Sequence, residues 1–418
     1  MTIKNTILFL VCGFVSLGSF FGSALRAEPT ESKEPCLPHS YQELVRCAVM
    51  QSAEIQLAEQ QLKTASNLEG IARQGINPEL DLESVRKSSD QSETTVSLLF
   101  DVRLGGKRDA ALNEARAEIE KTKAQRDLNS SQTKLDLILK LYRLYHLKGE
   151  IKIEEESVST FAKIVNQFQA KAALSPEQEV SLSIFRMAAT DHQLSLTKLR
   201  NEEGKIIQEV ISSTGLSTQI VQENLPSRRT LWPEISLDQQ ADSSPYVRFA
   251  QGDLMVAKSQ REKANAEAWP DFKIGPAIKV QNDGGTTENF FGLSLSTPLP
   301  IFNLNASGRA YSGQKVVEAE MSLSLANRRI AATRAQLIKT YQGIVATLKS
   351  SLSAKVVAEK HEQIERLFFR GLVPSSIVIE AHRQLIDLEK NKNESERDAI
   401  EALGSVYIID NQFSEVIL

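Results

Sequence analysis

One plan of elements occurs twice in the sequence, and this duplication constrains the fold more than any other feature. Segments 41–225 and 245–410 each run helix, strand, strand, long helix, turn and long helix. Four landmarks recur in the same order at offsets of 192 to 202 residues: Pro78 and Pro270, Gly106 and Gly308, Tyr142 and Tyr341, Leu174 and Leu372. Their shared order indicates an internal duplication. Prolines and serines between the copies predict a linker over 226–244.

Strict alternation of apolar and polar residues predicts two strands in each copy. The first copy alternates Val96, Leu98, Phe100 and Val102 with polar residues, and its partner strand carries Leu80 and Leu82. The second copy repeats the pattern over 272–280 and 291–295. Each run is about 10 residues long, which suits a tilted transmembrane strand. Soluble hairpins packed on a core are the alternative reading of this alternation.

The neighbourhood of the strands favours the membrane reading. The polar stretches 87–93 and 281–288 are expected to form exposed hairpin loops, and aromatic residues near the strands, such as Trp269 and Phe291, would suit an interfacial girdle. Four strands cannot close a barrel, since the smallest barrels have about eight. Three chains, each giving four strands, could close one.

Two stretches without proline and with little glycine, 107–171 and 308–370, predict long helices. About 60 helical residues span roughly 90 Å. Segments 177–214 and 375–403 are expected to return as antiparallel arms with a coiled-coil charge pattern. The chain would reverse at two tips, near 174–176 and 371–374.

The N-terminus reads as a secretory signal. Residues 1–27 contain Lys4, an apolar run over 7–21 and small residues before Glu28. An uncleaved anchor is the alternative, but the run is shorter than the roughly 20 residues that span a bilayer. The expected organisation is a signal peptide over 1–27, a first repeat over 28–225, a linker over 226–244 and a second repeat over 245–418.

Cysteine content agrees with an oxidising compartment. Cys12 would leave with the signal, so Cys36 and Cys47 remain as one isolated pair. A disulfide between them is the favoured interpretation, and two free thiols are the alternative.

The sequence shows no pattern of catalytic chemistry. Net charge is −4, which gives no basic bias toward nucleic acid. The five histidines, His39, His146, His192, His361 and His382, are scattered, with no second histidine at i+4. His382 is expected at the surface. Gly106-Lys107 lacks the serine or threonine of a phosphate-binding loop. We therefore expect no enzyme activity, no cofactor and no metal site.

Two junction motifs resemble those of the TolC family of outer-membrane factors, in the branch that serves heavy-metal efflux pumps. They are Leu104-Gly105-Gly106-Lys107-Arg108 after the second strand and Thr297-Pro298-Leu299-Pro300-Ile301-Phe302-Asn303 after the fourth. The resemblance implies a mainly helical fold with β-structure and a location in the cell outer membrane, with a helical part in the periplasm. It also implies a homotrimer whose 12-stranded outer-membrane β-barrel continues as a periplasmic α-helical coiled-coil barrel.

The resemblance further implies a passive exit duct of a tripartite efflux system. Its expected cargo is heavy-metal cations, moved by an RND-type pump. The expected partners are two further copies, a periplasmic adaptor (membrane fusion protein), an inner-membrane efflux pump and outer-membrane lipid, without nucleic acid. Glu380 would form a ring of three carboxylates that gates the periplasmic end and raises their apparent pKa values. A solvated helix charge is the alternative for Glu380.

The tips would contact the adaptor through small and apolar residues: Ala173, Leu174, Ser175, Gly371, Leu372 and Val373. A turn that needs Gly371 and Pro374 only to reverse the chain is the alternative. Two other functions remain open. One is a channel for drug efflux or type I secretion, and the other is a coiled-coil periplasmic adaptor, although an adaptor usually has one hairpin and not two alternating with strand pairs.

Overall fold

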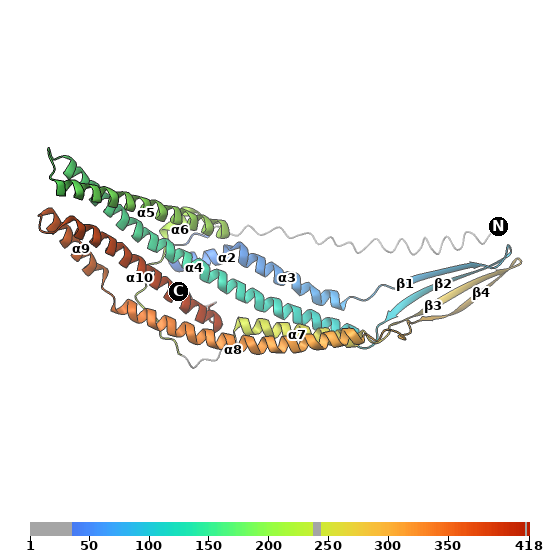
Figure 1. Cartoon of the computed structure of the whole chain (residues 1–418). Helices are drawn as coiled ribbons and strands as arrows, with labels where there is room; N and C mark the ends of the chain where they lie inside the picture. Colours follow the sequence, from blue (N-terminus) through green and yellow to red (C-terminus); the bar gives the residue numbers. More distant parts are fainter. Residues whose placement is uncertain (1–35, 237–243, 414–415) are drawn as a thin grey trace. The chain divides into compact units, whose positions relative to one another are not determined.

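The computed structural model describes residues 36–236, 244–413 and 416–418 (Figure 1). The predicted signal peptide lies outside these residues. Residues Pro38–Leu418 form one compact unit, separate from Met1–Leu37. Its first half contains α2 (Tyr41–Gln51), α3 (Ala53–Arg73), β1 (Glu79–Arg86), β2 (Gln91–Val102), α4 (Lys107–Gln169), α5 (Pro176–Thr214) and α6 (Thr218–Glu223). Its second half contains α7 (Pro245–Ala266), β3 (Phe272–Asp283), β4 (Thr286–Ser296), α8 (Ala306–Ser350), α9 (Ala354–Phe369) and α10 (Ser375–Ile409). The order helix, strand, strand, helices thus occurs twice.

The first helical hairpin agrees with the sequence prediction. Helix α4 has 63 residues and begins after Gly106, whose φ of 74° is the left-handed conformation that glycine adopts readily. Helix α5 begins at a capping box, in which Ser175 and Gln178 each accept a hydrogen bond from the other's backbone N–H, with Pro176 at the first position. It ends at Gly215 with φ of 70°. The prediction of a long helix, a turn and a returning arm is confirmed here.

The second long helix was predicted to be continuous over 308–370, and this prediction is wrong. Helix α8 ends at Ser350, and α9 begins after Ser353, whose hydroxyl accepts a hydrogen bond from the Val356 N–H. Ser351 donates its hydroxyl to the Leu348 carbonyl. Serine side chains compete with the backbone in this way, so a serine-rich stretch offers an end and a new start to a helix. Lys392 of α10 also donates to the Leu352 carbonyl inside the break.

The four strands form one antiparallel sheet in the order β1-β2-β3-β4 (Figure 1). One row of directly opposed residues crosses all four strands: Leu82, Val96, Ile278 and Phe291. The adjacent rows bring Leu80 opposite Leu98 and Ile274 opposite Leu295. Because opposed residues share a face, the apolar side chains of both copies line a single face, as the alternation predicted.

The strands are longer than the sequence indicated, because they continue into the polar stretches expected as loops. Strand β1 runs to Arg86 and β2 starts at Gln91, while only Gly284 and Gly285 separate β3 from β4. Both glycines have positive φ (56° and 102°), which a two-residue hairpin turn requires. The polar residues pair across the sheet, as Gln91 does with Asp283 at 2.6 Å.

The helices are held around α4, which packs against α3, α5, α7 and α10. The main core lies between these helices and contains the fully buried Ile138, Leu141, Ile400 and Leu403. A smaller second core lies toward the tips and is formed by Phe161, Ile164, Phe185 and Val378. These two separate cores hold α5 and α10 near both of their ends.

The described part of the segment that joins the two copies, 226–236, forms no helix or strand and packs against the helices. The Tyr341 hydroxyl donates to the Pro233 carbonyl at 2.7 Å, and Arg334 donates to the Ser236 carbonyl at 3.1 Å. Arg228 binds Glu389 and Asn393 of α10. The described part of the predicted linker, 226–236, is therefore docked by specific hydrogen bonds.

Asp271, just before β3, ties the two junction motifs to each other. Its carboxylate accepts a hydrogen bond from the Leu104 N–H at 3.2 Å and forms an ion pair with Lys107 at 2.8 Å. Its carbonyl accepts from the Thr297 hydroxyl at 3.1 Å. Gly105 lies so close to the Trp269 ring that an added Cβ would be 2.5 Å from it. These contacts fix the angle at which the sheet leaves the helices.

The helices of the described residues contain no apolar stretch of the length that a membrane-spanning helix needs.

Candidate functional site

The apolar face of the sheet is exposed in the single chain. Phe291 and Leu293 of β4 keep 80% and 79% of their accessible surface, and Leu80 and Leu82 of β1 are also largely exposed. Contiguous apolar surface of this kind marks contact with lipid or with another protein. The aromatic residues near the sheet, Trp269, Phe290, Phe291 and Phe302, are exposed as well.

Strands β1 and β4 are the two edges of this sheet. Each edge offers a row of backbone donors and acceptors that no strand of the described chain pairs. The sheet can therefore be extended on both sides by strands from other chains, and inside a lipid bilayer it must be, because unpaired backbone groups are not tolerated there.

The two predicted tips are turns between antiparallel helices. The first runs from Ala170 to Ser175, and Ala173 and Ser175 are exposed, while Leu174 is half-buried. The second follows α9, where Gly371 has φ of 72° and the Leu372 N–H donates back to the Leu367 carbonyl at 3.0 Å. This is the bonding pattern of a Schellman turn, which requires a left-handed residue at the position of Gly371.

Side chains at the second tip differ in exposure. Leu372 is exposed and Val373 is half-buried. Backbone geometry therefore accounts for Gly371, whereas nothing in the turn requires the exposed side chain of Leu372. Whether these six tip residues contact an adaptor stays a prediction.

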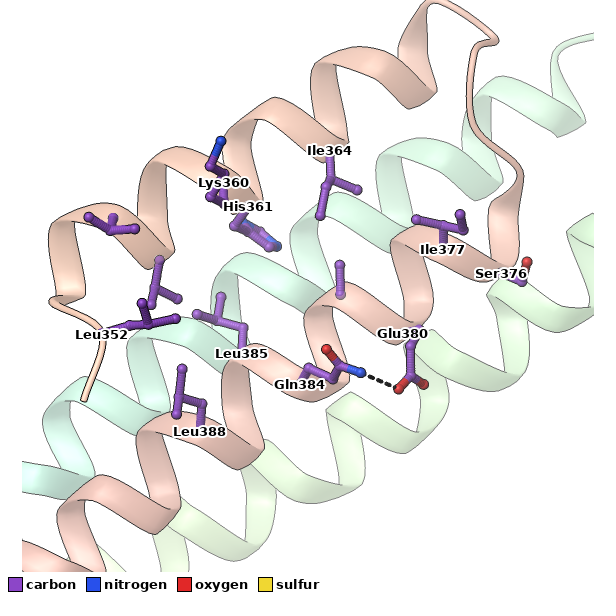
Figure 2. A pocket seen from close by; sticks show the side chains of 13 residues that line it. Leu352, Lys360, His361, Ile364, Ser376, Ile377, Glu380, Gln384, Leu385 and Leu388 are labelled. Carbon is purple, nitrogen blue, oxygen red and sulfur yellow. Dashed lines mark hydrogen bonds between the residues drawn. The ribbon is translucent and has the colours of Figure 1, made fainter. Parts of the chain in front are cut away.

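Glu380 lies on α10 about one and a half turns beyond the second tip, and its side chain is half exposed. It accepts hydrogen bonds from Arg383 at 2.8 and 3.0 Å and from the Gln384 amide at 2.8 Å, the last of which is drawn in Figure 2. The hydrogen bonds from Arg383 lower the pKa of the Glu380 carboxyl. The raised pKa expected for a ring of three carboxylates would require copies of the chain to meet at this residue.

An open apolar groove runs beside Glu380 between α9 and α10. Its volume is about 720 Å³, and Figure 2 shows Ile364 and His361 of α9 facing Ile377 and Leu385 of α10 across it. The groove ends near the helix break at Leu352.

The prediction that His382 lies at the surface is wrong. His382 is 1% exposed and lies against Phe161, with ring centroids 4.8 Å apart. The turn at the second tip brings it beside His361 and Glu365 of α9, and one ligand atom of each residue lies within 4.8 Å of the others. The sequence did not predict this cluster, because no histidine has a second histidine at i+4 to mark a metal site. The available signal was the His361–Glu365 spacing of i, i+4, which places both on one helix face.

Comparison with known proteins identifies the class of fold: the chain has the fold of TolC-like outer-membrane channels, and the resemblance drawn from its junction motifs is confirmed. The outer membrane protein VceC of Vibrio cholerae aligns with a TM-score of 0.68 and 15% identity, over 88% of this chain and 96% of VceC. The outer-membrane channel OprN aligns with a TM-score of 0.69 and 14% identity, over 89% of this chain and 90% of OprN.

A curated relative is similar in sequence. The cobalt-zinc-cadmium resistance protein CzcC of Cupriavidus metallidurans is 24% identical over 295 residues, which cover 69% of this chain and 68% of CzcC. No protein-family model matches the chain.

Proposed function

We propose that this chain is the outer-membrane channel component of a tripartite efflux system and not an enzyme. It acts as a passive exit duct from the periplasm to the exterior, stands in the cell outer membrane and extends its helical part into the periplasm. Three copies form the channel, and an adaptor and an inner-membrane pump supply the cargo.

One observation carries this proposal: the sheet exposes a continuous apolar face and has two edges that can still pair. A single four-stranded sheet cannot satisfy its edges in lipid, and barrels need about eight strands or more. Three copies of the four strands give 12, enough to close. The apolar face would then contact lipid, and the opposite face, with Asp81, Thr95 and Lys279, would face water.

The alternative function, a coiled-coil periplasmic adaptor, does not need this sheet. An adaptor needs one helical hairpin to bridge two partners, whereas here two hairpins are each preceded by a strand pair that joins one shared sheet. The exposed residues of β1 and β4 would have no role in a protein surrounded by water.

Heavy-metal cations are the proposed cargo, because the relative CzcC is a cobalt-zinc-cadmium resistance protein. Drugs or secreted polypeptides are the competing cargo. Deletion of the coding sequence should lower tolerance to cobalt, zinc or cadmium salts and leave tolerance to hydrophobic drugs unchanged. The reverse pattern would reassign the cargo while leaving the channel in place.

Oligomeric state tests the channel itself. We expect the mature protein, extracted from outer membranes with detergent, to have the mass of three chains by light scattering corrected for detergent. Recovery as a monomer from the soluble periplasmic fraction would contradict the channel and favour the adaptor.

Conductance tests Glu380 as the gate. In planar bilayers Glu380→Gln should lower the preference for cations over anions, because three carboxylates near a narrow pore attract cations. Glu179→Gln removes a carboxylate from the first turn of α5 at the other tip and is the matched control. Equal ion preference in wild type and Glu380→Gln would mean that Glu380 is a solvated charge on its helix and not a gate.

A disulfide between Cys36 and Cys47 belongs to the same proposal, since the periplasm is oxidising. Intact mass spectrometry after alkylation without reduction should show no added alkyl groups on the mature chain. Two added groups would mean free thiols.

A further inference from the structure

The cluster of His361, Glu365 and His382 includes none of the residues assigned to the two proposed contact surfaces, the apolar face of the sheet and the tips. His361 and Glu365 are one turn apart on α9, and His382 faces them from α10. The ligand atoms of the three side chains lie within 4.8 Å of one another. Two imidazoles and one carboxylate form a donor set that binds zinc and its neighbours in the first transition row in preference to calcium or magnesium.

Neighbouring residues orient two of these side chains. The Nδ1 atom of His382 lies 2.9 Å from the Ser157 hydroxyl, and its Nε2 atom points at Glu365 Oε1, 3.1 Å away. Thr160 donates its hydroxyl to the same carboxylate at 3.4 Å. A histidine that binds a metal through one nitrogen commonly holds its other nitrogen in such a hydrogen bond, which fixes the ring.

The third side chain has an unused nitrogen. His361 Nε2 is buried and has no hydrogen-bond partner among the described residues. The His361 ring stands perpendicular to that of His382, at 85° and 4.3 Å between centroids. Buried imidazole nitrogens usually have a partner, so this one calls for a ligand from outside the described residues.

We propose that His361, Glu365 and His382 bind one divalent transition-metal ion, with Zn²⁺ as the reference case, and that water fills the remaining position. In a tetrahedral zinc site with bonds near 2 Å, neighbouring ligand atoms are about 3.3 Å apart. The His382–Glu365 pair is already at 3.1 Å. The His361 ligand atom lies within 4.8 Å of the other two, so it must come up to about 1.5 Å closer to reach the same distance.

An ion can reach this site from solvent. His361 and Glu365 line a groove of about 630 Å³ that also borders Thr160 and Glu156, and His361 lines the groove of Figure 2 on its other side. A metal site needs such an entry path as well as its ligands.

The consequence of binding lies in α9. This helix is separated from α8 by the break at 351–353, so its position depends on its packing against α10 and on side-chain contacts such as Thr160 with Glu365 and Phe185 with Phe368. A metal bound by two residues of α9 and one of α10 would fix the second hairpin near its tip. The site thus acts as a clamp on the helical end. This role does not depend on whether the duct carries metals, drugs or polypeptides.

The competing explanation is a metal-free cluster in which His382 and Glu365 form a buried hydrogen-bonded pair. That explanation requires no metal affinity and predicts no effect of His361 on metal binding. The two are distinguished by titrating the whole protein, purified in detergent without a histidine tag and stripped with a chelator.

Titration with Zn²⁺ against a competing chromophoric chelator should give one site per chain in the wild type. His361→Ala and Glu365→Gln should each weaken that site by at least about tenfold. Glu362→Gln, an exposed carboxylate on the same helix, and His39→Ala, a distant histidine, are the controls and should bind as wild type. Helical circular dichroism and oligomer size must be unchanged in all four variants for the comparison to count.

A second readout confirms the ligands without relying on affinity. Co²⁺ substituted into the wild type should give the visible absorption of a four-coordinate site, and His361→Ala should lose it. Absence of stoichiometric Zn²⁺ binding in the wild type, or wild-type affinity in His361→Ala, overturns the proposal. A negative result in these metal-binding tests would not contradict the proposed channel function, because the trimer and conductance tests do not depend on this cluster.

Discussion

Arg143 of α4 links two helices and satisfies a buried carboxylate. It donates to both oxygens of Glu202 on α5, at 2.7 and 2.9 Å, and to Glu150 at 2.8 Å. Glu150 is 4% exposed and also accepts from the Asn393 amide at 2.9 Å. The bidentate geometry suits a guanidinium and would be lost with lysine, which has no planar pair of donors.

This pair predicts a pH dependence of stability. Hydrogen bonds from Arg143 lower the pKa of Glu202 below its ordinary 4.5. The contribution of Glu202 is therefore complete above pH 4.5 and is lost as the pH falls through the lower folded-state pKa. Glu202→Gln should reduce stability at neutral pH by about 1 kcal/mol or less, since the pair is partly exposed. It should also make the protein lose less stability than the wild type does when the pH is lowered.

Thermal unfolding followed by circular dichroism, at pH values on either side of 4.5, measures this effect. Glu203→Gln, the neighbouring carboxylate, serves as the control. If Glu202→Gln and wild type lose stability equally on acidification, the Arg143–Glu202 pair does not contribute.

Strand β4 shows how one element carries two environments. Leu293 lies on the apolar face opposite Pro276, and Ser296, three residues on, lies on the other face opposite Lys273. Both side chains are exposed in the single chain. Only the proposed membrane position makes them differ in what they contact.

We expect Leu293→Arg to disfavour the membrane-inserted state by about 2 to 4 kcal/mol if the position lies near the bilayer centre. Ser296→Arg should have little effect, because its side chain faces water. Heat-modifiable electrophoretic mobility after insertion into liposomes measures the folded fraction. Equal folding of the two variants would mean that the apolar face does not contact lipid.

The start of helix α9 is a second feature of an element that the sequence did not predict. Its composition matched a long uninterrupted helix, yet the chain breaks at 351–353 and resumes at a serine cap. Neither proline nor glycine stands at this break, which instead contains three serines, at 350, 351 and 353. Serine is compatible with a helix interior, so the break depends on Lys392 binding the freed Leu352 carbonyl as well as on the caps.

Across the whole compact unit, the segment between the copies acts as a strap. Arg228 donates to Glu389 at 2.6 Å and to Asn393 at 2.5 Å, and its Nε lies 3.5 Å from the buried Glu396. His146 of α4 lies 3.1 Å from the same Glu396 carboxylate. The strap therefore connects a helix of the first copy to one of the second through a shared polar network.

Arg228→Ala should destabilise the unit by about 3 kcal/mol, because it leaves buried Glu396 short of a positive partner. Arg229→Ala is the matched control, since Arg229 reaches Glu396 through its backbone N–H, at 2.5 Å, and keeps that bond. Chemical denaturation of the detergent-solubilised protein compares the two. A larger loss in Arg229→Ala than in Arg228→Ala would contradict the role assigned to the Arg228 side chain.

The features that depend on neighbours along the chain could be predicted from the sequence. Alternation over Val96, Leu98 and Phe100 fixed the apolar face, and the absence of proline fixed α4 to within two residues of its predicted end at 171. Period and propensity act locally, so one chain is enough to predict them. The landmarks shared by the copies also predicted the order of elements.

Tertiary structure alone decided which distant residues meet. Asp271 joins the two junction motifs and Glu396 gathers Arg228 and His146, and no spacing in the sequence announces these contacts. His382 became buried beside His361 because the turn at Gly371 docks α10 on α9 in one rotation. That rotation follows from packing around Phe161 and Val378, a sum of many contacts that periodicity along one helix does not determine.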